Sequence, residues 1–276
     1  MRYTHFTFNS CIELGEYVQK LVKNKAPQWD DSSTTNPRSE NGGFSMNDAV
    51  TTALNGGNWQ DGANKMPSLA ICHDRLHGHT SDESIIENNM FGFAPNVGAY
   101  LSGAPDNMMS FETAPTGDKL LRVAVHVGRI WSSEQHQVLN RGAAIMAVLD
   151  QLSREGFNIE LWAIWRNDDD GEGISVETCI KHGNDFWTPS SVAFALCHIA
   201  FQRRLCWRVA ESVERGQAGY GLSGYGTGMS ADFSDFDLSF GYVTEALKYD
   251  TLDKALTTIK TSTDQQLKAL AQKEAA

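Results

Sequence analysis

The chain has 276 residues, of which 41% are hydrophobic, so it is long and apolar enough for one large globular domain with a proper core. Its formal net charge of −11 at pH 7 disfavours non-specific binding to nucleic acid or to an anionic membrane. The five cysteines are odd in number and form no Cys-x-x-Cys pair, and no run approaches the roughly 20 apolar residues of a membrane span. We therefore expect a cytoplasmic protein with reduced thiols and no membrane partner.

An N-terminal helical segment is expected over residues 1–26. Ser10-Cys-Ile-Glu13 matches the capping box, in which the Ser and Glu side chains each satisfy a backbone N–H at a helix start, so a helix is predicted over Cys11–Lys23. Residues 27–44 are mostly Ser, Thr, Asn, Asp, Pro and Gly, with too little apolar content to offset the entropy of ordering them. We expect them to form a mobile linker.

An α/β domain is expected over residues 45–250. Its centre is an apolar strand at Leu120–Val127, a helix whose apolar residues recur between Val138 and Leu152, and a second apolar strand at Ile159–Trp165. Strands joined by a helical crossover are parallel, and strands without polar alternation are typically covered on both faces. The predicted fold class is therefore α/β: a three-layer sandwich with a mostly parallel central sheet, plus the N-terminal helical extension.

Three further elements are predicted towards the C-terminus. Thr188 and Pro189 are typical of an N-cap and a first helical position, and a helix is expected from there to about Ser212. One edge strand is expected between residues 232 and 242. Residues 251–276 carry apolar side chains at helical spacing and are predicted to form a C-terminal amphipathic helix.

Several stretches of the chain occur together in an order that is characteristic. They are Asn58–Gly62, Pro95–Pro105, Asn140–Leu149 with Gly156–Glu160, and Ala193–His198 with Arg203–Leu205. In this order they resemble an uncharacterised family of bacteriophage-encoded proteins whose core is similar to a von Willebrand factor A-type, Rossmann-like α/β domain. The resemblance implies a phage-encoded protein and supports the α/β fold, but it brings no biochemical activity with it.

The metal position of such a domain is altered in this chain. A metal-binding von Willebrand-type domain has Asp-x-Ser-x-Ser after its first strand, whereas the matching place here reads His126-Val-Gly-Arg-Ile130. Neither the aspartate nor the hydroxyl groups are present. This departure argues against metal-dependent adhesion.

Two other stretches contain candidate metal ligands. Cys72, His73, His77 and His79 place one thiol and three imidazoles within eight residues, and on a helix His73 and His77 share a face. Their spacing is not that of a standard structural zinc motif, so a helix end with surface histidines is the alternative. No cofactor other than such a divalent metal is expected.

An acidic stretch follows the second central strand. Asp168 and Asp170 lie where α/β proteins often bind ligands, which makes them candidate ligands for Mg²⁺ or Ca²⁺. When Gly171 is aligned with the invariant glycine of a calcium loop, Arg166 falls at the first ligand position. A solvated acidic loop therefore explains the pattern at least as well.

The chain has one basic and aromatic cluster. Arg203, Arg204 and Arg208 lie beside Trp207 and are candidate contacts for nucleic-acid phosphate. On a helix, however, Arg204 and Arg208 share a face that also offers Glu211, so a polar helix face is the alternative.

No catalytic motif is recognisable in the sequence, and no catalytic residue is assigned. We therefore expect a non-catalytic binding protein, an assembly, regulatory or host-interaction factor that binds a protein partner or associates with itself as a homo-oligomer. The alternatives are a nucleic-acid-associated protein of phage replication or transcription, and a metal-dependent hydrolase.

Overall fold

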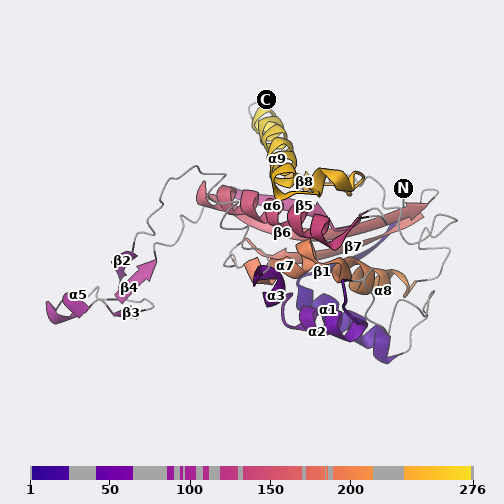
Figure 1. Cartoon of the computed structure of the whole chain (residues 1–276), viewed down its shortest axis with the longest axis horizontal. Coiled ribbons are helices and arrows are strands. Elements are labelled where there is room, and N and C mark those ends of the chain that lie inside the picture. Colours follow the sequence, from indigo (N-terminus) through magenta and orange to yellow (C-terminus); the bar gives the residue numbers. More distant parts are fainter. Residues whose placement is uncertain are drawn as a thin grey trace.

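The computed structural model of the chain is shown in Figure 1. It describes residues 2–24, 42–64, 86–89, 94–95, 97–103, 108–111, 119–129, 133–169, 172–183, 185, 189–213 and 233–274. Within these residues the fold is α/β, with a five-stranded central sheet and a separate three-stranded sheet. None of the described helices is long and apolar enough to cross a membrane.

The central sheet has the strand order β1-β7-β6-β5-β8. Its members are β1 (Arg2–Phe8), β5 (Lys119–His126), β6 (Phe157–Asp169), β7 (Glu172–Lys181) and β8 (Leu238–Phe240). The pairs β1/β7, β6/β5 and β5/β8 are parallel, and only β6/β7 is antiparallel. The prediction of an α/β fold with a mostly parallel sheet is therefore confirmed.

The strand–helix–strand unit at the centre of the chain is also confirmed. Strand β5 leads through helix α6 (Gln135–Arg154) into β6, and Val123 of β5 lies beside Leu161 of β6. Gly156 has a φ of 94°, a backbone conformation that glycine adopts without strain. The helix ends just before this glycine, at Arg154.

The prediction of an N-terminal helical extension is wrong for its first residues. Residues 2–8 form strand β1, which pairs with β7 along its whole length and makes one edge of the central sheet. Phe6 and Phe8 both pack in the core, while Thr7 between them is exposed. This alternation was the available signal for a strand. The N-terminal segment is thus part of the α/β domain rather than an addition to it.

The helices pack on the sheet through a single apolar cluster. It joins Leu121 and Val123 of β5 to side chains from α1 (Cys11–Lys23), α2 (Met46–Leu54), α6, α7 (Pro189–Cys197), α8 (Trp207–Ala210) and α9 (Leu252–Glu274). The predicted cap of α1 is present, since Ser10 accepts a hydrogen bond from the backbone N–H of Glu13; Ser45 caps α2 in the same way, through the backbone N–H of Asp48. Short helix α3 (Gln60–Asn64) lies beside α7.

The opposite face of the sheet is more polar. Arg122 pairs with Glu160 at 3.2 Å, and Arg166 pairs with Glu177 at 3.1 Å. The rings of Phe236 and Phe233 lie over Arg122 and Arg166 respectively, at 5.1 and 5.3 Å from ring centre to guanidinium carbon. The two faces of the sheet therefore differ in chemistry, because successive residues of a strand point to opposite sides.

The helix predicted from Pro189 to Ser212 is interrupted. Helix α7 ends at Cys197, a π-helical turn follows over Phe201–Cys206, and α8 continues from Trp207. A π-turn rotates the side chains that follow it relative to a regular helix and is frequent at functional sites. Here it places Gln202 and Arg204 in the interior, with 4% and 0% of their surface exposed.

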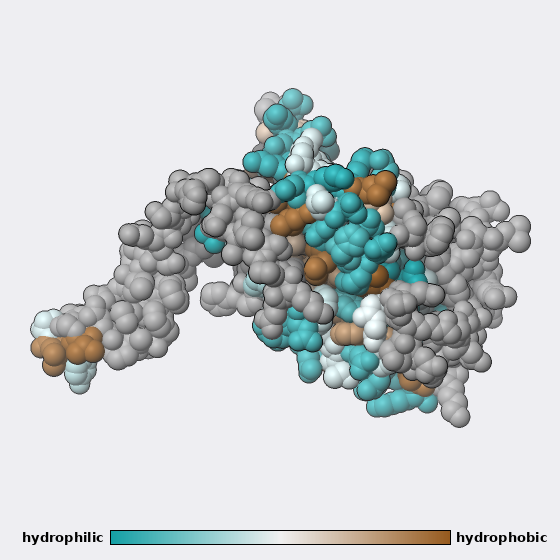
Figure 2. All heavy atoms as spheres, in the orientation of Figure 1, coloured by the Kyte–Doolittle hydropathy of each residue, from teal (hydrophilic) through white to brown (hydrophobic). Residues whose placement is uncertain are grey.

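The three-stranded sheet consists of β2 (Ile86–Asn89), β4 (Met108–Phe111) and β3 (Ala94–Pro95), in that order. Helix α5 (Val97–Leu101) adjoins it, at the end of the molecule away from the central sheet (Figure 1). Val97, Tyr100 and Leu101 on α5 are 64%, 66% and 78% exposed. They form the apolar tip that Figure 2 shows in brown at the left.

Candidate anion-binding site

The candidate site lies where the neighbouring parallel strands β5 and β8 end. After β5 the chain runs through Val127 and Gly128 to Arg129 and on to α6, while after β8 it runs to Val243, which forms an isolated parallel bridge with Arg129. Ligands of α/β proteins commonly bind beyond the carboxyl ends of parallel strands, where neighbouring connections diverge. A cavity occupies this position, and we refer to it as the Arg129 cavity.

Arg141 on α6 holds the two strand ends together. Its Nη1 donates a hydrogen bond to the carbonyl of His126 at 3.2 Å, and its Nη2 donates to the carbonyls of Phe240 and Gly241 at 3.1 and 2.9 Å. The side chain is buried, and the ring of Tyr249 lies 5.9 Å from its guanidinium carbon. Because a strand end leaves carbonyl groups without ladder partners, this guanidinium satisfies acceptors that would otherwise be buried and unpaired.

Arg129 is bound at one end only. Its Nη1 donates to Oε1 of Gln202 at 3.3 Å, from the π-helical turn. Its Nε and Nη2 have no hydrogen-bond partner among the residues that the structure describes, although the side chain is only 4% exposed. A buried guanidinium normally has its donors satisfied, so the two vacant N–H groups need an acceptor from outside the described chain.

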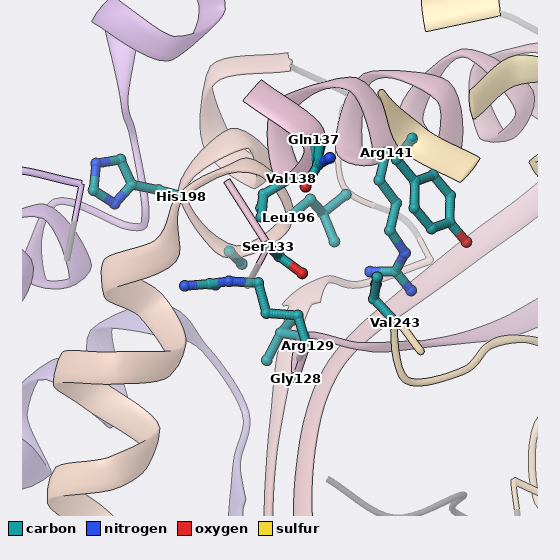
Figure 3. Close-up of a pocket in the computed structure, with 12 residues that line it drawn as sticks. Gly128, Arg129, Ser133, Gln137, Val138, Arg141, Leu196, His198 and Val243 are labelled. Carbon is teal, nitrogen blue, oxygen red and sulfur yellow. The ribbon is translucent and has the colours of Figure 1, made fainter. Parts of the chain in front are cut away.

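Ser133 and Gln137 complete the cavity at the start of α6. The Ser133 hydroxyl is buried, 8% exposed, and also has no partner within the described ranges. Gln137 accepts a hydrogen bond from the backbone N–H of Glu134 at 3.0 Å, so it caps the helix. In Figure 3 the Ser133 hydroxyl lies between the guanidinium groups of Arg129 and Arg141.

The remaining lining is largely apolar and includes Val127, Val138, Ala195, Leu196 and Val243. His198 also borders the cavity, but its ring packs against Phe44 and Trp59, with ring centres 4.1 and 4.5 Å apart, and is turned away from the two arginines (Figure 3). The free space inside is about 20 Å³, room for about one water molecule. With the open hollow in front of it, the empty volume reaches about 380 Å³.

The electrostatics of the cavity are positive. Burial, and then the charge of Arg203, lower the pKa of Arg129 to about 9, so this guanidinium remains protonated at neutral pH. Burial likewise lowers the pKa of Arg141, whereas Tyr249 and Cys197 act to raise this pKa. The described groups that act on the two arginines include no carboxylate. The cavity therefore combines unpaired donors with uncompensated positive charge, which is the chemistry of an anion site.

His126 at the end of β5 adds no charge to the site. Its Nδ1 accepts a hydrogen bond from the backbone N–H of Gly128 at 3.0 Å. Burial, together with the charges of Arg141 and Arg166, lowers the pKa of His126 to about 3. The imidazole is thus neutral and shapes the turn that leads to Arg129.

The predicted metal ligands lie elsewhere or outside the described residues. Cys72, His73, His77, His79 and Asp170 belong to ranges that the structure does not describe, so zinc, magnesium or calcium there stays a prediction. Asp168 falls within strand β6 and pairs with Gly173 of β7, so the strand runs two residues into the stretch predicted as a loop. Across the described parts of the chain, no three His, Cys, Asp or Glu side chains are grouped so that they could hold a metal.

Of the predicted nucleic-acid contacts, Arg203 lies near Arg129, whereas the other two point into the interior. Arg204 and Arg208 are fully buried, and they donate to the carbonyls of Phe44 and Leu21, each at 3.2 Å. Arg208 also lies 3.6 Å from Glu211, as the alternative of a polar helix face expects, but both residues are buried. Arg203 is partly exposed and lies over the ring of Trp207 at 5.4 Å.

Sequence reasoning missed Arg129, Arg141, Ser133 and Gln202. In the stretch His126–Ile130 the sequence shows Arg129 only as a departure from the metal-ligand pattern. An arginine after a buried strand, followed four residues later by a serine at a helix start, was the available signal for an anion site. The role of Gln202 could not be read in this way, because it depends on the π-turn.

Comparisons with known proteins bear on the whole chain rather than on this site. No curated protein and no solved structure matches it. One family model does, and it covers residues 4–268, which includes both strands that border the cavity. The chain therefore belongs to the family described as a domain of unknown function, DUF7192.

Proposed function

We propose that this protein is a non-catalytic binding protein and that its ligand carries an anionic group, which binds in the Arg129 cavity. One observation carries the proposal. Arg129 lines the cavity, and its Nε and Nη2 groups are buried and have no acceptor in the part of the chain that the structure describes. Ser133 adds a third unpaired donor to the same cavity.

The energetics favour a bound anion. A buried charge without a partner costs several kcal/mol, roughly, because it has lost the hydration that it had in the unfolded chain. An anion that meets the guanidinium recovers this cost in the form of charge-assisted hydrogen bonds. Such a ligand binds the folded chain only, so it also raises the free energy of unfolding.

The test is stabilisation by simple anions. Sodium phosphate, sulfate and acetate are titrated into the protein in a low-salt buffer whose own anion is a bulky sulfonate, and the melting temperature is recorded. At about 100 times its Kd an anion adds about 2.7 kcal/mol, which corresponds to a shift of roughly 5–10 °C for a chain of this size.

The matched variants are Arg129→Met and Arg154→Met. Arg154 is a half-exposed residue of α6 that pairs with Asp150 at 3.2 Å, so its loss removes a charge away from the cavity. We expect anion stabilisation to persist in Arg154→Met and to disappear in Arg129→Met. Equal stabilisation of both variants would contradict the proposal, because it would come from general salt effects.

A second candidate function is association with nucleic acid, as in phage replication or transcription. It is favoured by Arg203, which stacks on Trp207, is partly exposed, and contributes positive charge at Arg129. Labelled single-stranded DNA should then bind at low salt, with an affinity that falls steeply as salt rises and that drops in Arg203→Glu. Absence of binding at low salt rejects this function.

The cellular setting and the complete architecture belong to the same proposal. We infer a phage-encoded protein that acts in the bacterial cytoplasm, on the strength of the sequence motifs that resemble the phage family. For the architecture we propose a three-layer sandwich of von Willebrand factor A type, which the mostly parallel order of the central sheet supports. The exposed apolar residues of α5 support a protein partner or self-association.

A further inference from the structure

The vacant donors of Arg129 form one particular edge of its guanidinium. Gln202 occupies Nη1, which leaves Nε and Nη2. These two nitrogens project nearly parallel N–H bonds from the same side of the planar group, which is the side-on fork that binds two oxygens of one anion. The π-helical turn that positions Gln202 therefore determines which edge of Arg129 remains available.

The dimensions of the cavity discriminate between anions that this fork could bind. Its enclosed space is about 20 Å³, close to that of one water molecule. A tetrahedral phosphate or sulfate is about equally wide in every direction, so it fits such a narrow space less well than a flat group does. A carboxylate is flat, so it can enter edge-on with its oxygens towards the guanidinium while its carbon stays at the mouth.

The apolar part of the lining suits a ligand whose anionic oxygens are attached to an alkyl carbon. Val127, Val138, Leu196 and Val243 border the cavity together with the polar donors. The outer oxygens of a phosphate would lose hydration against these side chains without gaining donors, which is unfavourable. An alkyl carbon attached to a carboxylate loses only apolar surface there, which is favourable.

The number of vacant donors also suits a carboxylate. Nε and Nη2 of Arg129, Nε of Arg141 and the Ser133 hydroxyl are the side-chain donors at this cavity that lack a partner among the described residues. An ionised carboxylate has about four lone-pair sites on two oxygens. A phosphate has more acceptor sites than the cavity has vacant donors.

Resting on the anion-binding role proposed above, we propose that the anionic group is a carboxylate attached to an apolar carbon, bound side-on by Nε and Nη2 of Arg129 with Ser133 as a further donor. Two sources supply this chemistry. One is a small carboxylic acid, and the other is the free C-terminus of a peptide that ends in an apolar residue.

The experiment measures the Kd of matched ligands by NMR titration of the full chain in the same sulfonate buffer. The ligands are propionate and its neutral counterpart propionamide, phosphate and sulfate, and an apolar-ended peptide with either a free or an amidated C-terminus. We expect propionate to bind and propionamide not to bind. Tighter binding of the free-acid peptide than of propionate, with none by its amide, assigns the carboxylate to a peptide terminus; the reverse order assigns it to a small acid.

Variants test whether binding needs the parallel pair of donors on Arg129 or only its positive charge. Arg129→Lys keeps a cation but loses the parallel pair of donors, so propionate should bind at least about 10-fold more weakly. Ser133→Ala should weaken binding about 5-fold, and Arg154→Met should leave it unchanged. Far-UV circular dichroism and the melting temperature establish that each variant is folded, and Arg129→Lys serves as the test if Arg129→Met does not fold.

The outcomes distinguish this inference from the one on which it rests. If phosphate or sulfate binds in an Arg129-dependent way and propionate does not, the anion site stands and the carboxylate assignment falls. If propionate binds equally well to Arg129→Lys, the side-on fork is wrong. If no anion binds, both proposals fall together.

Discussion

The two ends of the central sheet place polar side chains in very different states. Because β6 and β7 are antiparallel, β1 and β7 end at the edge opposite to the one where β5 and β8 end. A hollow of about 250 Å³ adjoins that far end and is lined by Cys11, Cys179, Lys181, His182 and Asp185 among others. It is far larger than the Arg129 cavity, yet it lacks the feature that marks the smaller one.

At the far end the buried charge is satisfied. Lys181 donates to the carbonyls of Ile159, His182 and Gly183 at 2.8, 3.0 and 3.2 Å, so its charge is fully engaged. The Cys179 thiol lies 3.5 Å from Nδ1 of His182, and burial, followed by the charge of Glu160, raises its pKa to about 11. A thiol in this state is not a nucleophile at neutral pH.

The comparison shows that vacant donors identify a site better than volume does. Arg141 and Lys181 are equivalent in this respect, since each ties three carbonyls together at its own end of the sheet. Arg129 has no counterpart at the far end among the described residues. On this basis Arg141 and Lys181 stabilise the fold, whereas Arg129 has donors left for a ligand.

Replacement of Arg141 or Lys181 should have the largest effect on the free energy of unfolding. In Arg141→Met three strand-end carbonyls lose their donor, and we expect the free energy of unfolding to fall by about 3 kcal/mol. Lys181→Met should cost about 2–3 kcal/mol for the same reason. Urea unfolding measures both, and a loss below about 1 kcal/mol in either variant would mean that its carbonyls find other donors.

A methyl group at Gly128 should disturb the Arg129 end specifically. A Cβ atom there would lie 2.5 Å from Cε1 of His126 and 3.1 Å from Cδ2 of Tyr242. We expect Gly128→Ala to cost about 2 kcal/mol, because both rings are held in place by their packing. Gly241→Ala is the control, since apart from its chain neighbours no atom of the described residues lies within 4 Å of its added Cβ, and it should stay within about 0.5 kcal/mol of the native chain.

The neutral His126 predicts a pH dependence of stability. Its pKa is about 3 in the folded chain and near 6.5 in the unfolded chain, so between these values only the unfolded chain binds the proton. The free energy of unfolding should therefore fall by about 1.4 kcal/mol per pH unit as the pH drops below 6.5, and this contribution is fully present above that pH. In His126→Gln the slope over this window should decrease by that amount; an unchanged slope would show that His126 is protonated in the fold.

The smallest effect is expected from Cys179→Ser at the far end. The substitution keeps a small polar side chain next to His182, and the anion affinity of the Arg129 cavity should change by less than about 2-fold. Native Cys179 should react with iodoacetamide far more slowly than the denatured chain at pH 8. Rapid native alkylation would make the far end the more reactive of the two.

The core of the fold could be predicted from the sequence because its signals are local. Strands β5 and β6 are apolar runs, α6 has helical spacing, and Gly156 marks its end. Strand β1 was missed because its short run mixes His and Thr with Phe, and its burial depends on β7, which lies about 170 residues further along the chain.

The site was harder to predict, for a physical reason. A buried arginine looks in a sequence like any surface charge, and Arg129 becomes buried only when β8 pairs with β5. Gln202 meets Arg129 only because a π-turn interrupts the helix that regular spacing predicts. The burial of Arg129 and its bond to Gln202 both arise from tertiary structure, so no local sequence pattern predicts them.

The most direct test of the account is the free energy of unfolding of Arg129→Met, measured by urea in the sulfonate buffer with and without propionate. Without an anion the variant should lie within about 1 kcal/mol of the native chain, because the lost bond to Gln202 is offset by removal of an unpaired buried charge. With propionate, only the native chain should gain stability. If the free energy of unfolding falls by more than about 3 kcal/mol in the anion-free buffer, the account is contradicted, since Arg129 would then stabilise the fold as Arg141 does.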